Sequence, residues 1–164
     1  MQKLLLAFFV LTVTSPVTAQ NVTLSLAEKL RLGMVMDATA FKALTDGNTI
    51  TYNNGVEDIY REYFRPGTNR IVIEWTEARD PSQTICDTGT WYEENGLICF
   101  NWSASGSVCA LWVDYEGEYI SAIAGIDGTF ERNLEVISTI TTTPLYCEVG
   151  MVQLQQSILD AEAG

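Results

Sequence analysis

The chain contains no histidine among its 164 residues, and this absence excludes several common chemistries. Hydrolases that use a histidine base, zinc sites with histidine ligands and histidine-based pH switches are all ruled out. The sequence also lacks a phosphate-binding glycine loop and a dinucleotide-binding glycine fingerprint. Its four cysteines lack the two closely spaced pairs that a zinc tetrathiolate uses. We therefore expect no metal centre and no cofactor.

Basic residues are scarce: the chain has 9 of them against 21 acids, and its net charge is −12 at pH 7. After residue 79 the imbalance is extreme, with 13 acids and Arg132 as the single base. Such a charge repels nucleic acid and anionic membrane surfaces, so we expect neither as a partner. The acidic second half indicates either a generally soluble surface or a face for a cationic partner or metal ions.

Long apolar runs are missing except near the N-terminus, where Lys3 precedes Leu4–Val13, a stretch interrupted only by Thr12. Pro16 and the small-residue sequence Val17–Thr18–Ala19 follow. This order is typical of a cleaved secretory signal peptide at residues 1–19, and the run is shorter than the roughly 20 residues of a membrane span. We predict export to the periplasm or the extracellular space, without stable membrane insertion after cleavage. The alternative is an N-terminal anchor that stays attached.

Two short helices are predicted in the helical N-terminal segment, residues 20–47. Ser25 and Glu28 have the spacing of a capping box, and Gly33 is expected to weaken or end the first helix. Asp37 or Thr39 caps the second helix, which Gly47 ends. We expect this segment to pack on the domain that follows.

From residue 48 to residue 150 the pattern changes to short strands separated by turn residues, which predicts an antiparallel β-domain. The mainly β chain is expected to form a meander that closes into a small up-and-down barrel or wraps a strongly curved sheet. The tail, residues 151–164, could form a short helix over Val152–Ala161. The expected strands are Thr49–Tyr52, Ile59–Phe64, Arg70–Thr76, Thr88–Tyr92, Leu97–Trp102, Ser107–Tyr115, Glu118–Ala124 and, more weakly, Val136–Thr142 and Leu145–Val149.

One hairpin can be aligned residue by residue. If Ser103–Ser105 is a three-residue loop, Cys99 faces Cys109, and apolar residues face apolar ones on either side. A facing pair of this kind lies within disulfide reach. Cys86 then pairs with Cys147 by elimination. A two-residue turn at Glu116–Gly117 continues the meander.

Aromatic residues and paired acids are the remaining candidates for function. The four tryptophans, Trp75, Trp91, Trp102 and Trp112, indicate either core packing or a pocket for an apolar or carbohydrate ligand. Carboxylates at Glu93–Glu94 and at Asp114, Glu116 and Glu118 could serve glycoside hydrolysis, but hairpin tips are where acids are usually just solvated. No catalytic residue is assigned.

The sequence Gly89–Thr90–Trp91, followed by Gly96, Cys99 and Cys109, resembles a pattern in small exported bacterial β-rich domains of unknown function. The resemblance covers about half of the expected mature chain and implies a β-rich secreted or periplasmic domain without a known activity. Three functions are therefore considered. The first is a non-enzymatic exported domain that binds a small ligand or a protein. The second is a hydrolase inhibitor that acts through a hairpin tip, and the third is a glycoside hydrolase with a carboxylate pair.

Overall fold

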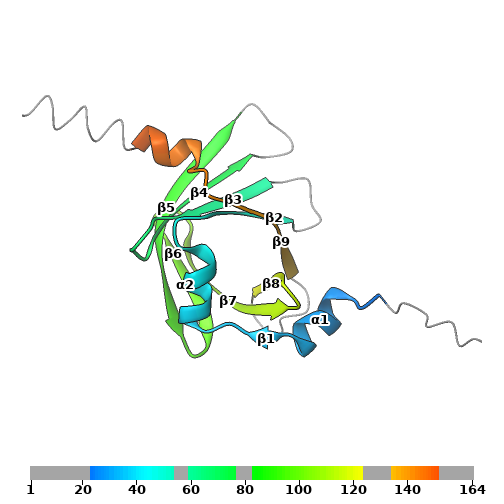
Figure 1. Ribbon diagram of the computed structural model, residues 1–164. Helices are drawn as coiled ribbons and strands as arrows, with labels where there is room; N and C mark the ends of the chain where they lie inside the picture. Colours follow the sequence, from blue (N-terminus) through cyan, green and yellow to red (C-terminus); the bar gives the residue numbers. More distant parts are fainter. Residues whose placement is uncertain (1–22, 54–58, 77–82, 124–133, 152–164) are drawn as a thin grey trace, which may run out of the picture.

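The computed structural model describes residues 23–53, 59–76, 83–123 and 134–151. The predicted signal peptide and the predicted terminal helix, Val152–Ala161, lie outside these ranges. The described chain is mainly β and forms a closed antiparallel barrel with two short helices near the N-terminus (Figure 1). The sequence-based prediction of an up-and-down barrel is confirmed.

Eight strands make the barrel, and each pairs with the strand that follows it in the chain. The last strand returns to pair with the first, which closes the ring. The strands are β2 (Thr49–Asn53), β3 (Ile59–Phe64), β4 (Arg70–Thr76), β5 (Thr84–Glu94), β6 (Leu97–Trp102), β7 (Gly106–Tyr115), β8 (Glu118–Ile123) and β9 (Leu134–Thr141).

Two tight turns determine the register of neighbouring hairpins. Asn95 and Gly96 join β5 to β6 with φ angles of 54° and 78°, and Glu116 and Gly117 join β7 to β8 with 54° and 86°. Two consecutive positive φ angles are typical of a type I′ turn, whose twist matches the twist of the two strands that it joins. The predicted register of the β7–β8 hairpin is confirmed, with Val113 opposite Ile120.

Helix α1 (Leu26–Leu32) packs on the outside of the barrel. The predicted capping box between Ser25 and Glu28 is present, and Gly33 is the C-cap. A Cβ atom on Gly33 would lie 2.2 Å from Cγ1 of Val113, so glycine permits this close approach of the chain to β7. The next two residues form β1 (Met34–Val35), which pairs with β7 and was not predicted because two residues carry no periodicity.

Helix α2 (Ala38–Thr45) is capped by Asp37, one of the two predicted capping residues, and lies across one opening of the ring of strands (Figure 1). Its Phe41 side chain is fully buried. The ring packs edge-on against aromatic rings of the barrel interior, with centroids 4.8–6.2 Å apart, namely Phe64, Trp91, Phe100 and Trp112. Such arrangements are favoured for aromatic pairs. We refer to this opening as the α2 end and to the opposite one as the pocket end.

Both predicted disulfides are present on the outer wall. Cys99 and Cys109 face each other across β6 and β7 with a Cα–Cα distance of 4.0 Å, in the register derived from the sequence. Cys86 on β5 is joined to Cys147, which follows β9 in the chain. The second bond therefore fastens the segment after β9 to the barrel.

The expectation that Leu145–Val149 forms a strand is wrong: residues 146–151 are helical. Strands β9 and β2 already pair with each other, so neither offers a free edge to the segment that follows β9. Leu145 and Cys147 instead pack on the outer wall against Tyr63 and Val72.

Candidate functional site

A cavity of about 380 Å³ lies at the pocket end of the barrel. Its apolar wall comes from the strand ends farthest from α2, with Tyr60 on β3, Trp75 on β4 and Val108 on β7. The complete lining is Tyr60, Ile73, Trp75, Trp102, Ser105, Gly106, Ser107 and Val108. This cavity is the candidate binding site, and we call it the barrel pocket.

The four candidate tryptophans divide between the two ends of the barrel. Trp75 and Trp102 line the barrel pocket and are only partly buried. Trp91 and Trp112 are 8% and 1% exposed and pack against Phe41 at the α2 end. Two of the four residues thus belong to the pocket, and the other two belong to the core.

The position of Trp102 depends on Gly89, which faces it across β5 and β6. A Cβ atom at position 89 would lie 2.9 Å from Cε3 of Trp102 and 2.7 Å from the carbonyl oxygen of Asn101. The indole also stacks on Phe100, with 6.0 Å between ring centroids. The glycine of the Gly89–Thr90–Trp91 motif therefore makes room for a wall of the pocket.

Asp87 anchors the turn between β6 and β7 that borders the pocket. Its carboxylate accepts hydrogen bonds from the backbone amide of Thr88, the hydroxyl groups of Ser103 and Ser105, and the amide of Ala104. Burial by itself would raise the pKa of Asp87, but these hydrogen bonds outweigh it and hold the pKa below its usual value. The turn is thus held by an ionised acid that the sequence analysis had not selected.

Deeper in the barrel, the hydroxyl group of Tyr52 donates a hydrogen bond of 2.5 Å to the carboxyl group of Glu62. Glu62 is 8% exposed and faces Ile73, a residue of the pocket lining, across β3 and β4. Desolvation raises the pKa of Glu62 to about 8, although the bond from Tyr52 partly opposes the shift. The pKa of Tyr52 lies well above its usual value, because burial and the neighbouring Glu62 both disfavour the phenolate.

Glu135 on β9 is a second interior acid. It faces Ser121 across β8 and β9, and burial raises its pKa. Its charge acts on both Tyr52 and Glu62. The sequence analysis missed both interior acids. The alternation of Tyr60, Glu62 and Phe64 on one face of a strand was the pattern that could have revealed Glu62.

Three of the acids that the sequence suggested for glycoside hydrolysis make structural contacts at the hairpin tips. Glu93 accepts a hydrogen bond of 2.9 Å from the amide of Ala38, the first residue of α2. Asp114 accepts one of 2.8 Å from the amide of Gly117, and Glu118 forms an ion pair of 2.7 Å with Lys29. None of these three contacts places two carboxyl groups across a cleft.

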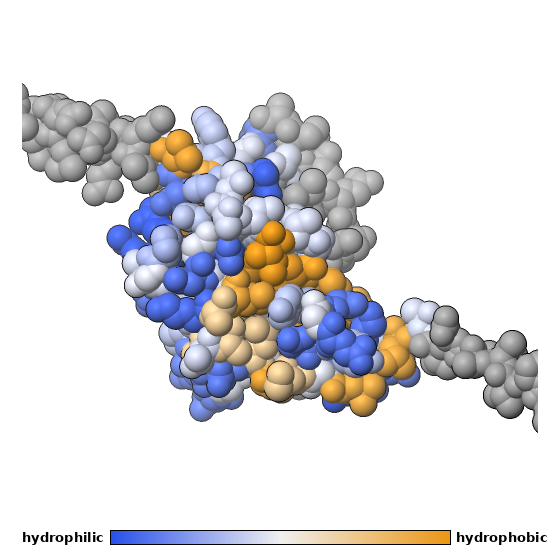
Figure 2. Space-filling view, viewed as in Figure 1, coloured by the Kyte–Doolittle hydropathy of each residue, from blue (hydrophilic) through white to orange (hydrophobic). Residues whose placement is uncertain are grey.

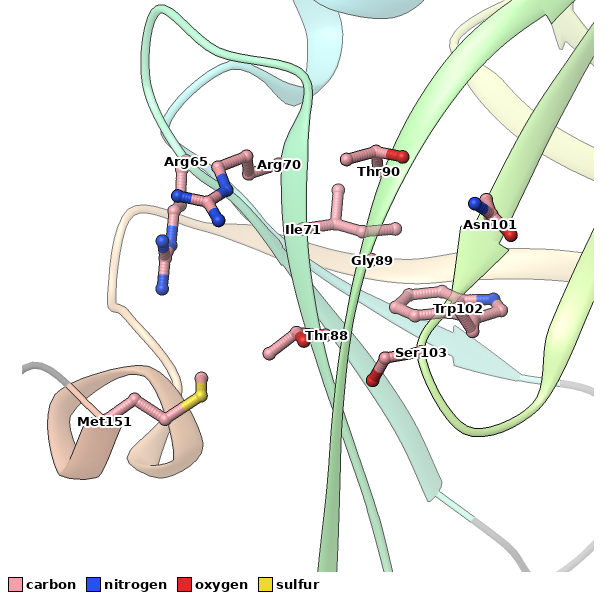
Figure 3. A pocket seen from close by; sticks show the side chains of 10 residues that line it. All are labelled: Arg65, Arg70, Ile71, Thr88, Gly89, Thr90, Asn101, Trp102, Ser103 and Met151. Carbon is pink, nitrogen blue, oxygen red and sulfur yellow. The ribbon is translucent and has the colours of Figure 1, made fainter.

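A second hollow, of about 490 Å³, lies along the wall beside the helical residues 146–151 (Figure 3). Figure 3 shows Arg65, Arg70 and Met151 on one flank and Asn101 and Trp102 on the other. Arg65 is paired with Glu148 of this helical segment at 2.8 Å. The second hollow is more polar than the barrel pocket, and the ion pair beside it secures the helical segment to the barrel.

Apolar side chains are also exposed around α1 and β1 (Figure 2), where Leu32, Met34 and Val35 are 67%, 71% and 54% exposed. Among the helices of the described ranges, none combines the length and apolarity needed to cross a membrane.

Comparisons of the chain with protein-family models, with curated proteins and with solved structures yield no match. A proposal about the function of the protein therefore rests on the barrel pocket and the interior acids.

Proposed function

We propose that this chain is an exported, non-enzymatic protein that binds a small, largely apolar ligand in the barrel pocket. The observation that carries the proposal is the cavity of about 380 Å³ lined by Tyr60, Trp75, Trp102 and Val108. Ligand sites in proteins are concave, mostly apolar and roughly 300–1,000 Å³ in volume, and barrel mouths are common places for them.

The partial exposure of Trp75 and Trp102 supports this assignment. Leaving apolar area in water costs roughly 25 cal/mol per Å², and a bound apolar ligand would recover that free energy. The described turns at Asn95–Gly96 and Glu116–Gly117 are tight, with no extended tip. They give less support to an inhibitor that acts through a hairpin.

Export is the second part of the proposal. The two disulfides are compatible with an oxidising compartment. Mass spectrometry of protein recovered from outside the cytoplasm should give an N-terminus at Gln20 or within a few residues of it. Recovery of exported protein that still begins with Met1 would contradict the cleavage.

Binding can be tested with N-phenyl-1-naphthylamine, a neutral probe whose fluorescence rises in apolar surroundings. We expect saturable binding of one probe per chain by the oxidised protein. Val108→Trp adds bulk inside the pocket and should weaken binding at least about tenfold, which corresponds to roughly 1.4 kcal/mol.

Val35→Trp is the matched control, because it adds the same side chain at an exposed position on β1. It should leave probe binding unchanged. If the wild-type protein does not bind the probe, or if both variants bind it as well as the wild type, the barrel pocket is not the binding site.

A further inference from the structure

Acidic side chains line the barrel interior beside the pocket. Glu62 and Asp87 both face Ile73, one from β3 and the other from β5, and Ile73 is part of the pocket lining. Glu135 approaches from β9. Three carboxyl groups from three strands therefore surround the same region, and each is at least partly buried.

Basic side chains in the described part of the chain all lie elsewhere. Lys29 pairs with Glu118, Arg61 with Glu74 and Arg65 with Glu148, all on the outer surface. The other three, Arg31, Lys42 and Arg70, are exposed. No described protein cation thus lies beside Glu62 or Glu135, and burial raises the pKa of both carboxyl groups.

One buried polar group in the barrel interior has open hydrogen-bonding capacity. In the ranges that the structure describes, the indole N–H of Trp112, a side chain only 1% exposed, has no hydrogen-bond partner. Trp112 faces Ser121, which in turn faces Glu135, and the Trp112 ring contacts that of Tyr52 with centroids 6.0 Å apart. An interior that only packs apolar groups would not leave such atoms unpaired.

We propose that the ligand of the barrel pocket is a small organic amine whose ammonium group faces Glu62 and Glu135 and whose apolar body lies among Tyr60, Trp75 and Trp102. This inference rests on the proposed binding function and specifies its ligand class. A carboxylate and the face of an aromatic ring both attract an ammonium ion, and both attractions strengthen where water is excluded.

The proposal has a proton balance that can be measured. The ammonium keeps its proton, and Glu62, which is protonated in the free protein at pH 7, releases its own proton to solvent as the ion pair forms. The other titratable groups that face Glu62 are Tyr52 on β2, which stays protonated, Glu135 on β9, and Asp87 on β5, which is already ionised. Amine binding should therefore tighten as the pH rises from 6 to 8.

Octan-1-amine and octan-1-ol, each displacing N-phenyl-1-naphthylamine, form the test pair because they share one chain and differ in the charged group. We expect the amine to bind at least about tenfold more tightly than the alcohol at pH 8, and its affinity to rise at least about tenfold between pH 6 and 8. The affinity for the alcohol should not depend on pH. Calorimetry in two buffers of different ionisation enthalpy should show proton release only with the amine.

Three variants test which acid causes the preference for the amine and the release of a proton. Glu62→Gln should abolish the proton release and most of the preference for the amine, and Glu135→Gln should reduce that preference. Glu94→Gln changes an exposed acid on the outer wall and should alter neither property. If the alcohol binds as tightly as the amine at every pH, the amine proposal is overturned while the binding function stands. If neither compound nor the probe binds, the binding function itself fails.

Discussion

The two ends of the barrel contain the same kinds of side chain but are filled in different ways. At the α2 end, Phe41 enters from the helix and buries Phe64 and Trp112 to 1% exposure each. At the pocket end, Trp75 and Trp102 stay partly exposed around a cavity and stand near interior acids. Phe41 of the chain itself therefore fills the α2 end, whereas no described side chain fills the cavity at the pocket end. The α2 end thus serves stability, and the pocket end is suited to binding.

The largest contrast is expected from removing one aromatic ring at each end. Phe41→Ala deletes the ring that four other aromatic side chains contact, and it should lower the free energy of unfolding by about 3–5 kcal/mol. Trp75→Ala removes a partly exposed ring and should cost about 1–2 kcal/mol. Guanidinium unfolding of the oxidised proteins measures both. Equal costs would mean that the pocket end is packed as tightly as the α2 end.

The next effect is expected from the interior acid Glu62. Its pKa rises from 4.5 to about 8 on folding, so the folded state favours the protonated form. This stabilising contribution is complete below about pH 4.5 and is lost as the pH rises through about 8, with a slope of at most about 1.4 kcal/mol per pH unit. The free energy of unfolding, measured from pH 5 to 8, should therefore fall.

Glu62→Gln provides the control for this titration, because the amide keeps an acceptor for Tyr52 but does not titrate between pH 5 and 8. The variant should show a clearly shallower decline over that range. Identical pH profiles for the variant and the wild type would place Glu62 in contact with water and weaken the contrast between the two ends.

The smallest of the three stability effects is expected at the pocket wall. Gly89→Ala introduces a Cβ atom 2.7 Å from the Asn101 carbonyl oxygen and 2.9 Å from the Trp102 ring, so the indole must move. We expect a loss of about 1–2 kcal/mol in unfolding free energy together with weaker probe binding. Gly67→Ala in the β3–β4 turn, where nothing lies within 4 Å, should leave binding intact. Unchanged binding by the Gly89 variant would show that the position of Trp102 does not shape the pocket.

Much of the fold could be predicted because its determinants are local. The capping box at Ser25, the turn residues Glu116–Gly117 and the facing pair Cys99–Cys109 each depend on nearby residues and on strand alternation. The strand predicted at Leu145–Val149 was wrong because β9 pairs with β2, a long-range contact that leaves neither strand an edge for the segment that follows. Apolar alternation alone does not show which strand edges are already paired.

The site was predicted only in part, for a related reason. Composition identified the tryptophans, but their division between core and pocket depends on which barrel end α2 covers, and no short segment encodes that choice. The hairpin-tip acids attracted attention because they cluster in sequence. Glu62 and Glu135 lie 73 residues apart in the numbering and come together only because β2, between them in the sheet order, pairs with both β3 and β9. The closure of the barrel brings the two acids together, and the sequence predicted a barrel without showing which strands close it.

The most direct test of ligand binding at the pocket end uses the indole N–H signals in a nitrogen-15 correlation spectrum, assigned by single Trp→Phe variants and followed while N-phenyl-1-naphthylamine is added. Trp75 and Trp102 report on the pocket end, and Trp91 reports on the α2 end. We expect saturable shifts that are largest for Trp75 and Trp102 and small for Trp91. A larger shift for Trp91 than for Trp75 and Trp102, or no shift in any of the three, would contradict ligand binding at the pocket end.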